Sequence, residues 1–172
     1  MAQGRQDRKR RPRRGLLLLY KLPVWVYRLR LGWLLGRPLL GFWFLMITHR
    51  GRRTGKTYYT VVEIVRYDRT ANEYIVVSGH GETSDWYRNL RVTPPLCIQI
   101  GNRRYTVEQH FLPPEQVHLE FVGYEGRHPR AARTLPRHLG LPYDGSEAQR
   151  RMVTAALRMV AFRPTGEAGS PG

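Results

Sequence analysis

The chain has 172 residues, with 29 Lys or Arg against 13 Asp or Glu, so its net charge at pH 7 is +16. The length predicts one domain, and the charge implies an anionic partner: nucleic acid, an anionic membrane or a polyanionic cofactor. Cys97 is the sole cysteine, which excludes an intramolecular disulfide and a cysteine-rich zinc site and fits a reducing cytoplasm.

The N-terminal segment is the most basic part of the sequence. Residues 1–15 predict a disordered tail, because positive charge dominates there. Residues 16–40 predict an amphipathic helical segment, with a helix from about Pro23 to about Leu35. Two interpretations stay open: the helix lies on an anionic membrane surface, or its apolar face packs on the domain or on a partner subunit. We expect neither a membrane span nor a secretory signal.

From residue 41 the pattern changes to short apolar runs separated by turns, which predicts a mainly β domain over residues 41–164. The expected strands are 41–48, 57–67, 74–78, 96–100, 103–111 and a short last one at 159–162. Helices are expected at 84–91, 113–124, 128–138 and from Ser146, where Gln149 is placed to complete a capping box. About six strands with peripheral helices favour a small β-barrel, and residues 165–172 are expected to form a C-terminal tail.

A glycine-bracketed basic turn, residues 51–57, lies between the first two expected strands. Its polar residues are Arg52, Arg53, Thr54, Lys56 and Thr57. Its two glycines, Gly51 and Gly55, allow the backbone to turn and to approach a ligand closely. The spacing excludes a nucleotide-binding P-loop, which places more residues before its Gly-Lys pair and opens a helix rather than a strand. The turn therefore predicts either a phosphate or carboxylate site or an ordinary hairpin turn with solvated charges.

A second glycine-rich turn and a short helix follow the third expected strand. The residues of interest are Ser78, Gly79 and His80 in the turn and Trp86 and Asn89 on the helix. Each side chain also has an ordinary interpretation: Trp86 as a core anchor, Asn89 as a brace for the neighbouring turn, and His80 as a solvated loop residue. The six histidines show no metal-ligand spacing, so we expect no metal site.

Taken in this order, the basic turn before a long strand, the turn at residues 78–81 and the Trp-Tyr-x-Asn-Leu helix resemble the deazaflavin-dependent nitroreductase family, which uses coenzyme F-420. The likeness covers residues 29–164. It implies a split β-barrel of the flavin-reductase-like, FMN-binding type, usually dimeric. It also implies hydride transfer from the reduced coenzyme to a planar electrophile: a quinone, an enone or a nitro compound. Two features depart from the family: His80 stands where many relatives have Gly, and residues 126–145 differ from the tyrosine-rich substrate segment of the best-known members.

The resemblance also implies where the coenzyme binds. The basic turn would hold its anionic phosphodiester and polyglutamate tail, and the second turn and the helix would flank the deazaflavin ring. The implied cofactor-binding residues are Arg52, Arg53, Thr54, Gly55, Lys56, Thr60, Ser78, Gly79, His80, Trp86 and Asn89. The candidate catalytic residues, as proton donors to the reduced acceptor, are His80 and Tyr58, with Tyr124 and Tyr143 as further candidates.

Three alternatives stay open. FMN in the same barrel is the first, although the cations of the turn suit a polyanionic tail better than one phosphate. The second is a protein that binds or carries the coenzyme without turnover, and the third is a basic nucleic-acid-binding module. The favoured interpretation is a cytoplasmic homodimeric reductase with a small-molecule electron acceptor and no specific nucleic-acid partner. This interpretation leaves open a peripheral contact of the basic N-terminus with the inner face of the membrane.

Overall fold

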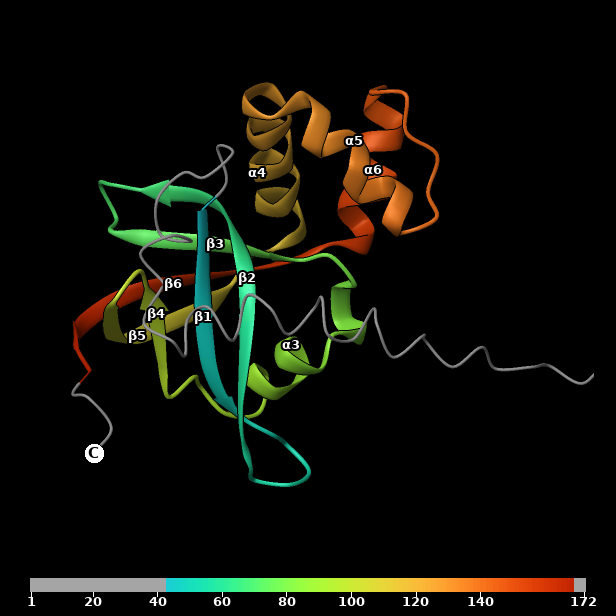
Figure 1. Ribbon diagram of the computed structural model, residues 1–172. Helices are drawn as coiled ribbons and strands as arrows, with labels where there is room; N and C mark the ends of the chain where they lie inside the picture. The colour runs from blue at the N-terminus through green and yellow to red at the C-terminus, as the bar shows by residue number, and fades with distance from the viewer. Residues whose placement is uncertain (1–42, 169–172) are drawn as a thin grey trace, which may run out of the picture.

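Alternating apolar side chains build a closed antiparallel barrel, shown in Figure 1. The computed structural model describes residues 43–168. Its strands are β1 (Trp43–Arg50), β2 (Thr57–Asp68), β3 (Glu73–Ser78), β4 (Cys97–Ile100), β5 (Arg103–Phe111) and β6 (Arg158–Glu167). Their order around the barrel is β1-β2-β3-β6-β5-β4, and β4 closes the ring by pairing with β1. The predicted six-stranded barrel with peripheral helices is confirmed.

The inside of the barrel is one apolar core. Every second residue of β1 points into it, so Leu45 and Ile47 are fully buried. The short helix α3 (Asp85–Leu90) adds Trp86 and Leu90 to the same core. In Figure 1 this helix lies beside β1 and β2, near the end where the two strands meet in a hairpin. The core therefore fixes α3 against the hairpin that carries the basic turn.

A second apolar core lies between the outer wall of the barrel and three helices. These are α4 (Pro114–Arg127), α5 (Pro129–His138) and α6 (Glu147–Ala156), which gather at one end of the molecule in Figure 1. Phe121 of α4 is the largest fully buried side chain there, and it packs with Val65, Ile75 and Leu157. We refer to this region as the helix–barrel seam.

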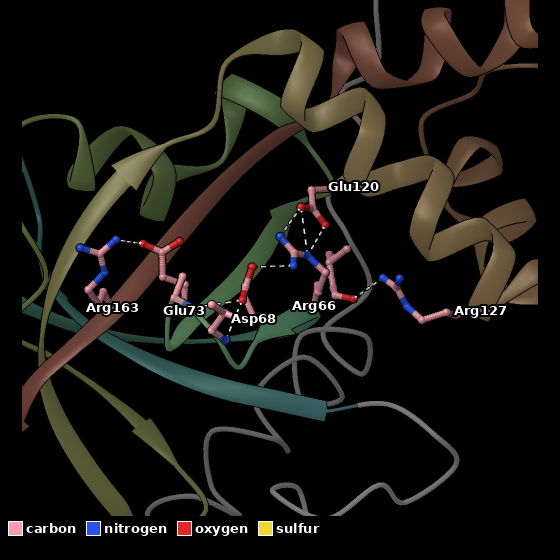
Figure 2. Close-up of polar contacts among 9 residues, drawn as sticks. Arg66, Asp68, Glu73, Glu120, Arg127 and Arg163 are labelled. Atoms are coloured by element: carbon pink, nitrogen blue, oxygen red, sulfur yellow. Dashed lines mark hydrogen bonds and ion pairs between the residues drawn. The ribbon is translucent and has the colours of Figure 1, made fainter.

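Charged and polar side chains rim the seam, as Figure 2 shows. Arg66 of β2 donates two hydrogen bonds of 2.8 Å to the two carboxylate oxygens of Glu120 on α4, and its Nη1 lies 2.8 Å from Asp68. Deeper in the seam, Tyr124 Oη donates to Glu63 Oε1 at 2.6 Å. Burial raises the pKa of the Glu63 carboxyl, because the charged form loses hydration there.

Two local expectations need correction. The last strand does not end at residue 162 but continues to Glu167, which pairs with Tyr105 of β5. The capping box of α6 is half formed: Ser146 Oγ accepts from Gln149 N, but Gln149 Oε1 accepts from Asp144 N at 2.6 Å. Asp144 in turn accepts from Ser146 N and takes the role expected of Gln149.

The expectations for the tail at 1–15 and the helical segment at 16–40 lie outside the described residues, as does the chain after residue 168. Within residues 43–168, no helix combines the length and the apolar character needed to cross a membrane.

Candidate functional site

The basic turn is the connection of the β1–β2 hairpin, and its backbone is held closed. Gly51 N donates to Lys56 O, and Gly55 N donates to Gly51 O, both at 2.8 Å. Gly55 has φ +65°, which side-chain-bearing residues rarely adopt, and a Cβ on Gly51 would lie 2.6 Å from the Tyr58 ring. The backbone of the turn therefore requires glycine at position 55, and a side chain at position 51 would displace Tyr58 or Thr54.

A cavity of about 340 Å³ opens between this turn, the start of β2 and α3, which is within the usual size range of small-molecule sites. We refer to it as the turn cavity. Its lining residues are His49, Gly51, Arg52, Arg53, Thr54, Tyr58, Tyr59, Thr60, Asp85, Trp86 and Asn89.

Arg52 connects the turn to α3. Its backbone N and its Nη1 both donate to Asn89 Oδ1, at 3.1 and 3.0 Å, and Nη1 also lies 2.9 Å from Asp85 Oδ1. Asp85 and Asn89 are four residues apart on α3, so they lie on one face of the helix. Nε and Nη2 of Arg52 have no hydrogen-bond partner among the described residues, so they remain available to an anion.

His49 continues the polar network below the turn. Its Nδ1 lies 3.2 Å from Asn89 Nδ2 and its Nε2 lies 3.1 Å from Thr60 Oγ1. The side chain is only 2% exposed. Burial lowers the pKa of this imidazole, because the protonated form loses hydration, so His49 is neutral near neutral pH.

The other cations at the turn have no carboxylate partner. The side chains of Arg50, Arg53 and Lys56 are exposed and make no hydrogen bond or ion pair within residues 43–168. The backbone N–H groups of Arg53 and Thr54 are also without a partner in that range, whereas Gly55 N is used within the turn. The turn therefore presents cationic side chains and two amides that an anion can bind.

Trp86 and Tyr58 are two of the aromatic side chains in the cavity wall. Trp86 is 9% exposed and packs in the barrel core with Tyr87, so it is a core residue and a cavity residue at once. Tyr58 is 42% exposed, its Oη lies 3.2 Å from Thr54 Oγ1, and its ring stacks on His49 at 6.0 Å between centroids. The Tyr58 hydroxyl is thus at the surface of the cavity.

The second glycine-rich turn does not line this cavity. Ser78 is buried, and its Oγ lies 2.8 Å from Gly81 O and 2.6 Å from Ser84 Oγ, so it braces its own turn. Gly79 is half-buried and His80 is exposed, with the His80 carbonyl accepting from Thr83. The assignment of these three residues to the coenzyme stays a prediction.

The remaining candidate residues lie either in the basic turn outside the cavity lining or at the helix–barrel seam. Gly55 and Lys56 belong to the turn but not to the cavity lining. Tyr124 and Tyr143, considered as proton donors, bind Glu63 and Glu125 at the helix–barrel seam instead.

Sequence reasoning did not select His49, Tyr59 or Asp85, which also line the cavity. His49 follows the inward alternation of β1 and directly precedes the turn, which is a readable signal for a buried polar residue at a site. Asp85 lies one turn of helix before Asn89, and that spacing was available as well.

Comparison with known proteins identifies the protein family of this chain. The model of the F420H(2)-dependent quinone reductase family matches residues 19–136, and the chain belongs to that family. The expected membership in a family of deazaflavin-dependent reductases is confirmed.

One curated relative is "Putative F420H(2)-dependent quinone reductase Rv3178" of Mycobacterium tuberculosis. It is 39% identical over 66 residues, which are 37% of this chain and 53% of the relative. The match thus spans about half the length of that protein.

Among solved structures, an F420-H2 dependent reductase, FDR-A, is 18% identical, with 70% of this chain and 93% of that chain covered and a TM-score of 0.45. A pyridoxamine 5'-phosphate oxidase-related, FMN-binding protein of Nostoc punctiforme is 10% identical, with 91% and 82% covered and a TM-score of 0.47. Because both scores are low, the assignment rests on the family match.

Proposed function

We propose that the protein transfers a hydride from reduced coenzyme F-420 to a quinone, with the coenzyme held at the turn cavity. The family membership supports the coenzyme and the acceptor class. The observation that carries the site is the set of turn cations that lack a carboxylate partner among residues 43–168 and lie beside a cavity of suitable size.

The residues of the turn fit a polyanionic group. Arg52 offers Nε and Nη2, and Arg53 and Lys56 add exposed charges at the rim. The amides of Arg53 and Thr54 can donate to phosphate oxygens in the same turn. Several cations in one short turn suit a phosphodiester with a carboxylate-rich tail better than they suit the single phosphate of FMN.

The inner part of the cavity fits a flat ring. Trp86 supplies an apolar wall that the barrel core holds in place, and Thr60 supplies a hydroxyl near the start of β2. When bound, the coenzyme supplies the hydride. The protein then has to hold ring and acceptor in contact and keep water out.

Tyr58 is the candidate that the geometry favours for a proton to the reduced quinone. Its hydroxyl lies at the cavity surface beside Thr54, whereas His80 lies outside the lining. Tyr58→Phe should lower quinone turnover while leaving coenzyme binding close to wild type. Equal turnover in the two proteins would exclude this role.

The test of the proposal is binding of the oxidised coenzyme, followed by its fluorescence. In Arg52→Ala/Lys56→Ala we expect the affinity to fall by at least about a hundredfold, because each of the two lost charge-assisted hydrogen bonds contributes on the order of 1.5–3 kcal/mol. The matched control is Arg69→Ala/Arg130→Ala, which removes the same charge from two exposed arginines away from the cavity. The control should bind as wild type does.

Turnover is then measured with the reduced coenzyme and a soluble naphthoquinone. Binding without turnover would support a carrier in place of a reductase. Preference for FMN, or retention by RNA that disappears with salt, would overturn the proposal in favour of the corresponding alternative.

We also propose the homodimer, the cytoplasmic location and the membrane contact of the basic N-terminus as parts of this function. Light scattering tests the dimer. Flotation with anionic vesicles, compared between the full chain and a chain without residues 1–15, tests the membrane contact.

A further inference from the structure

The hydrogen bonds beneath the turn cavity have a direction that can be read from one end to the other. Asn89 Oδ1 faces two groups of Arg52, the backbone N–H and Nη1, and both can only donate. The amide oxygen is therefore the atom that faces Arg52. The opposite orientation would place the Asn89 NH₂ group against two donors.

The orientation of Asn89 decides the tautomer of His49. Asn89 Nδ2, which can only donate, lies 3.2 Å from His49 Nδ1. Nδ1 must accept and therefore carries no proton. The neutral imidazole then has its proton on Nε2, which lies 3.1 Å from Thr60 Oγ1 and donates to it.

The tautomer of His49 in turn decides what Thr60 can do. Its hydroxyl oxygen accepts from His49, so its hydrogen is directed elsewhere. Among residues 43–168 no other hydrogen-bond partner faces this hydroxyl, and Thr60 lines the turn cavity. The hydroxyl hydrogen is thus left for a ligand.

We propose that the sequence of bonds Arg52–Asn89–His49–Thr60 fixes the Thr60 hydroxyl as a hydrogen-bond donor into the turn cavity, so that the site selects a ring with an acceptor atom there. The direction of the bonds follows from the geometry alone. The identity of the ring as a deazaflavin, which carries carbonyl and ring-nitrogen acceptors, rests on the proposed function. His49 is then a positioning residue, and Thr60 is the residue that contacts the ligand.

Among the groups around His49, Asp85 and the backbone of Arg50 favour the protonated imidazole, but burial outweighs them and the pKa of His49 is lowered. Asp85 approaches from α3, Arg52 from the turn and Tyr58 from β2, while β4 presents Cys97 opposite the neighbouring residue, Thr48. Protonation of His49 would place an N–H against the Asn89 NH₂ group, and that bond would be lost. Coenzyme affinity should therefore fall as the pH drops through the lowered pKa of His49.

The first experiment is ¹⁵N NMR of the imidazole side chains, with His49→Gln used to assign the His49 signals. The expected result is a neutral ring with its proton on Nε2. A proton on Nδ1 would overturn the direction of the bonds, whichever ligand the protein binds.

The second experiment measures binding of oxidised coenzyme F-420 to Thr60 variants. Thr60→Val should weaken binding about five- to tenfold, the effect of one hydrogen bond, and Thr60→Ser should restore it. His49→Gln, which offers an acceptor to Asn89 and a donor to Thr60, should bind better than His49→Leu. Circular dichroism and thermal unfolding show which variants are folded before binding is compared.

The outcomes separate the two proposals. If wild-type protein binds no F-420 but His49 carries its proton on Nε2, the proposed function is contradicted. The donor role of Thr60 is then tested with FMN, for which the same loss of affinity in Thr60→Val is expected. Equal affinity of wild type and Thr60→Val for the bound coenzyme would overturn the donor role itself.

Discussion

The turn cavity and the helix–barrel seam both contain arginines, but the two regions differ in how these arginines are paired with acidic residues. At the seam Arg66 pairs with Glu120 and Asp68, and Arg150 pairs with Glu125 at 2.6 Å. At the turn Arg53 and Lys56 have no acidic partner within residues 43–168. At the seam every one of these arginines is paired, within β2, between β2 and α4 or between α6 and α4. At the turn only Arg52 has an acidic partner, Asp85, among the described residues, so the charges of Arg53 and Lys56 stay available for a ligand.

This difference has an energetic consequence. Like charges held in one short turn repel one another, which destabilises the folded chain, and an anion at the turn would offset that repulsion. Changes at the seam should therefore alter stability, and changes at the turn should alter binding.

The largest expected effect is that of Phe121→Ala at the seam. Phe121 is 1% exposed, and its truncation should lower the free energy of unfolding by about 3–5 kcal/mol. Urea unfolding measures this loss, and coenzyme affinity is measured under conditions where the variant remains folded. An unchanged affinity would show that the seam contributes to stability and not to binding, and a matching loss of affinity would contradict that distinction.

The second prediction concerns the exposed cations of the turn. Arg53→Ala/Lys56→Ala should weaken coenzyme binding by about tenfold to thirtyfold, about 1.4–2 kcal/mol, with a smaller loss at high salt. The free energy of unfolding should stay within about 0.5 kcal/mol of wild type or rise slightly. A clear loss of stability would show that these cations support the fold after all.

The third prediction is Glu120→Gln, which removes the charge that faces Arg66 across the seam. Because the Arg66 side chain is 36% exposed, solvent screens the pair, and we expect a loss of about 1 kcal/mol in unfolding free energy. Coenzyme affinity should not change. A double-mutant cycle with Arg66→Gln isolates the interaction, and a coupling energy near zero would remove this pair from the seam's contribution.

The smallest expected effect is a pH dependence at Glu63. Its pKa is raised above 4.5, so its contribution to stability is complete below that pH and is lost as the pH rises through the folded-state value. Glu63→Gln should therefore gain stability relative to wild type between about pH 4 and pH 7, by less than about 1 kcal/mol. Urea unfolding at both pH values measures the difference.

His49 provides an internal control for that measurement. Its pKa is lowered, so its contribution is present above 6.5 and is lost as the pH falls, the opposite sign to Glu63. Since both proteins retain His49, the difference between them reports Glu63 alone. A difference that does not vary with pH would refute the raised pKa of Glu63.

The barrel and the turn could be predicted from the sequence because their signals are local. Short apolar runs separated by turns located the strands, and glycines around basic residues located the turn. The end of β6 was missed because Pro164 and Gly166 are poor strand residues. The structure accommodates them at an irregularity opposite Thr106 and Val107, where the register with β5 shifts.

The candidate site could be predicted only in part, because its residues come together through tertiary contacts that local sequence signals do not specify. Arg52, Thr60, Trp86 and Asn89, which the resemblance assigned to the coenzyme, line the turn cavity, and their binding role stays a prediction. The hydrogen bonds that join Arg52 to Asn89 and Thr60 to His49 depend on tertiary placement. His49 is joined to Asn89 across 40 positions of sequence, and nothing in the spacing of the two residues specifies that pairing.

The position of β6 between β3 and β5 also bears on how the chain assembles. The hairpin that carries the turn joins two strands that are consecutive in the sequence. In contrast, β3 pairs with β6, and α3, β4, β5 and the helices α4, α5 and α6 lie between them in the sequence. During synthesis, the β1–β2 hairpin and α3 leave the ribosome long before residues 158–167 can complete the wall. Loop-closure entropy makes such late, non-local pairing slow. A nascent chain would therefore expose an unpaired edge of β3 for a time, which is the stage at which aggregation competes with folding.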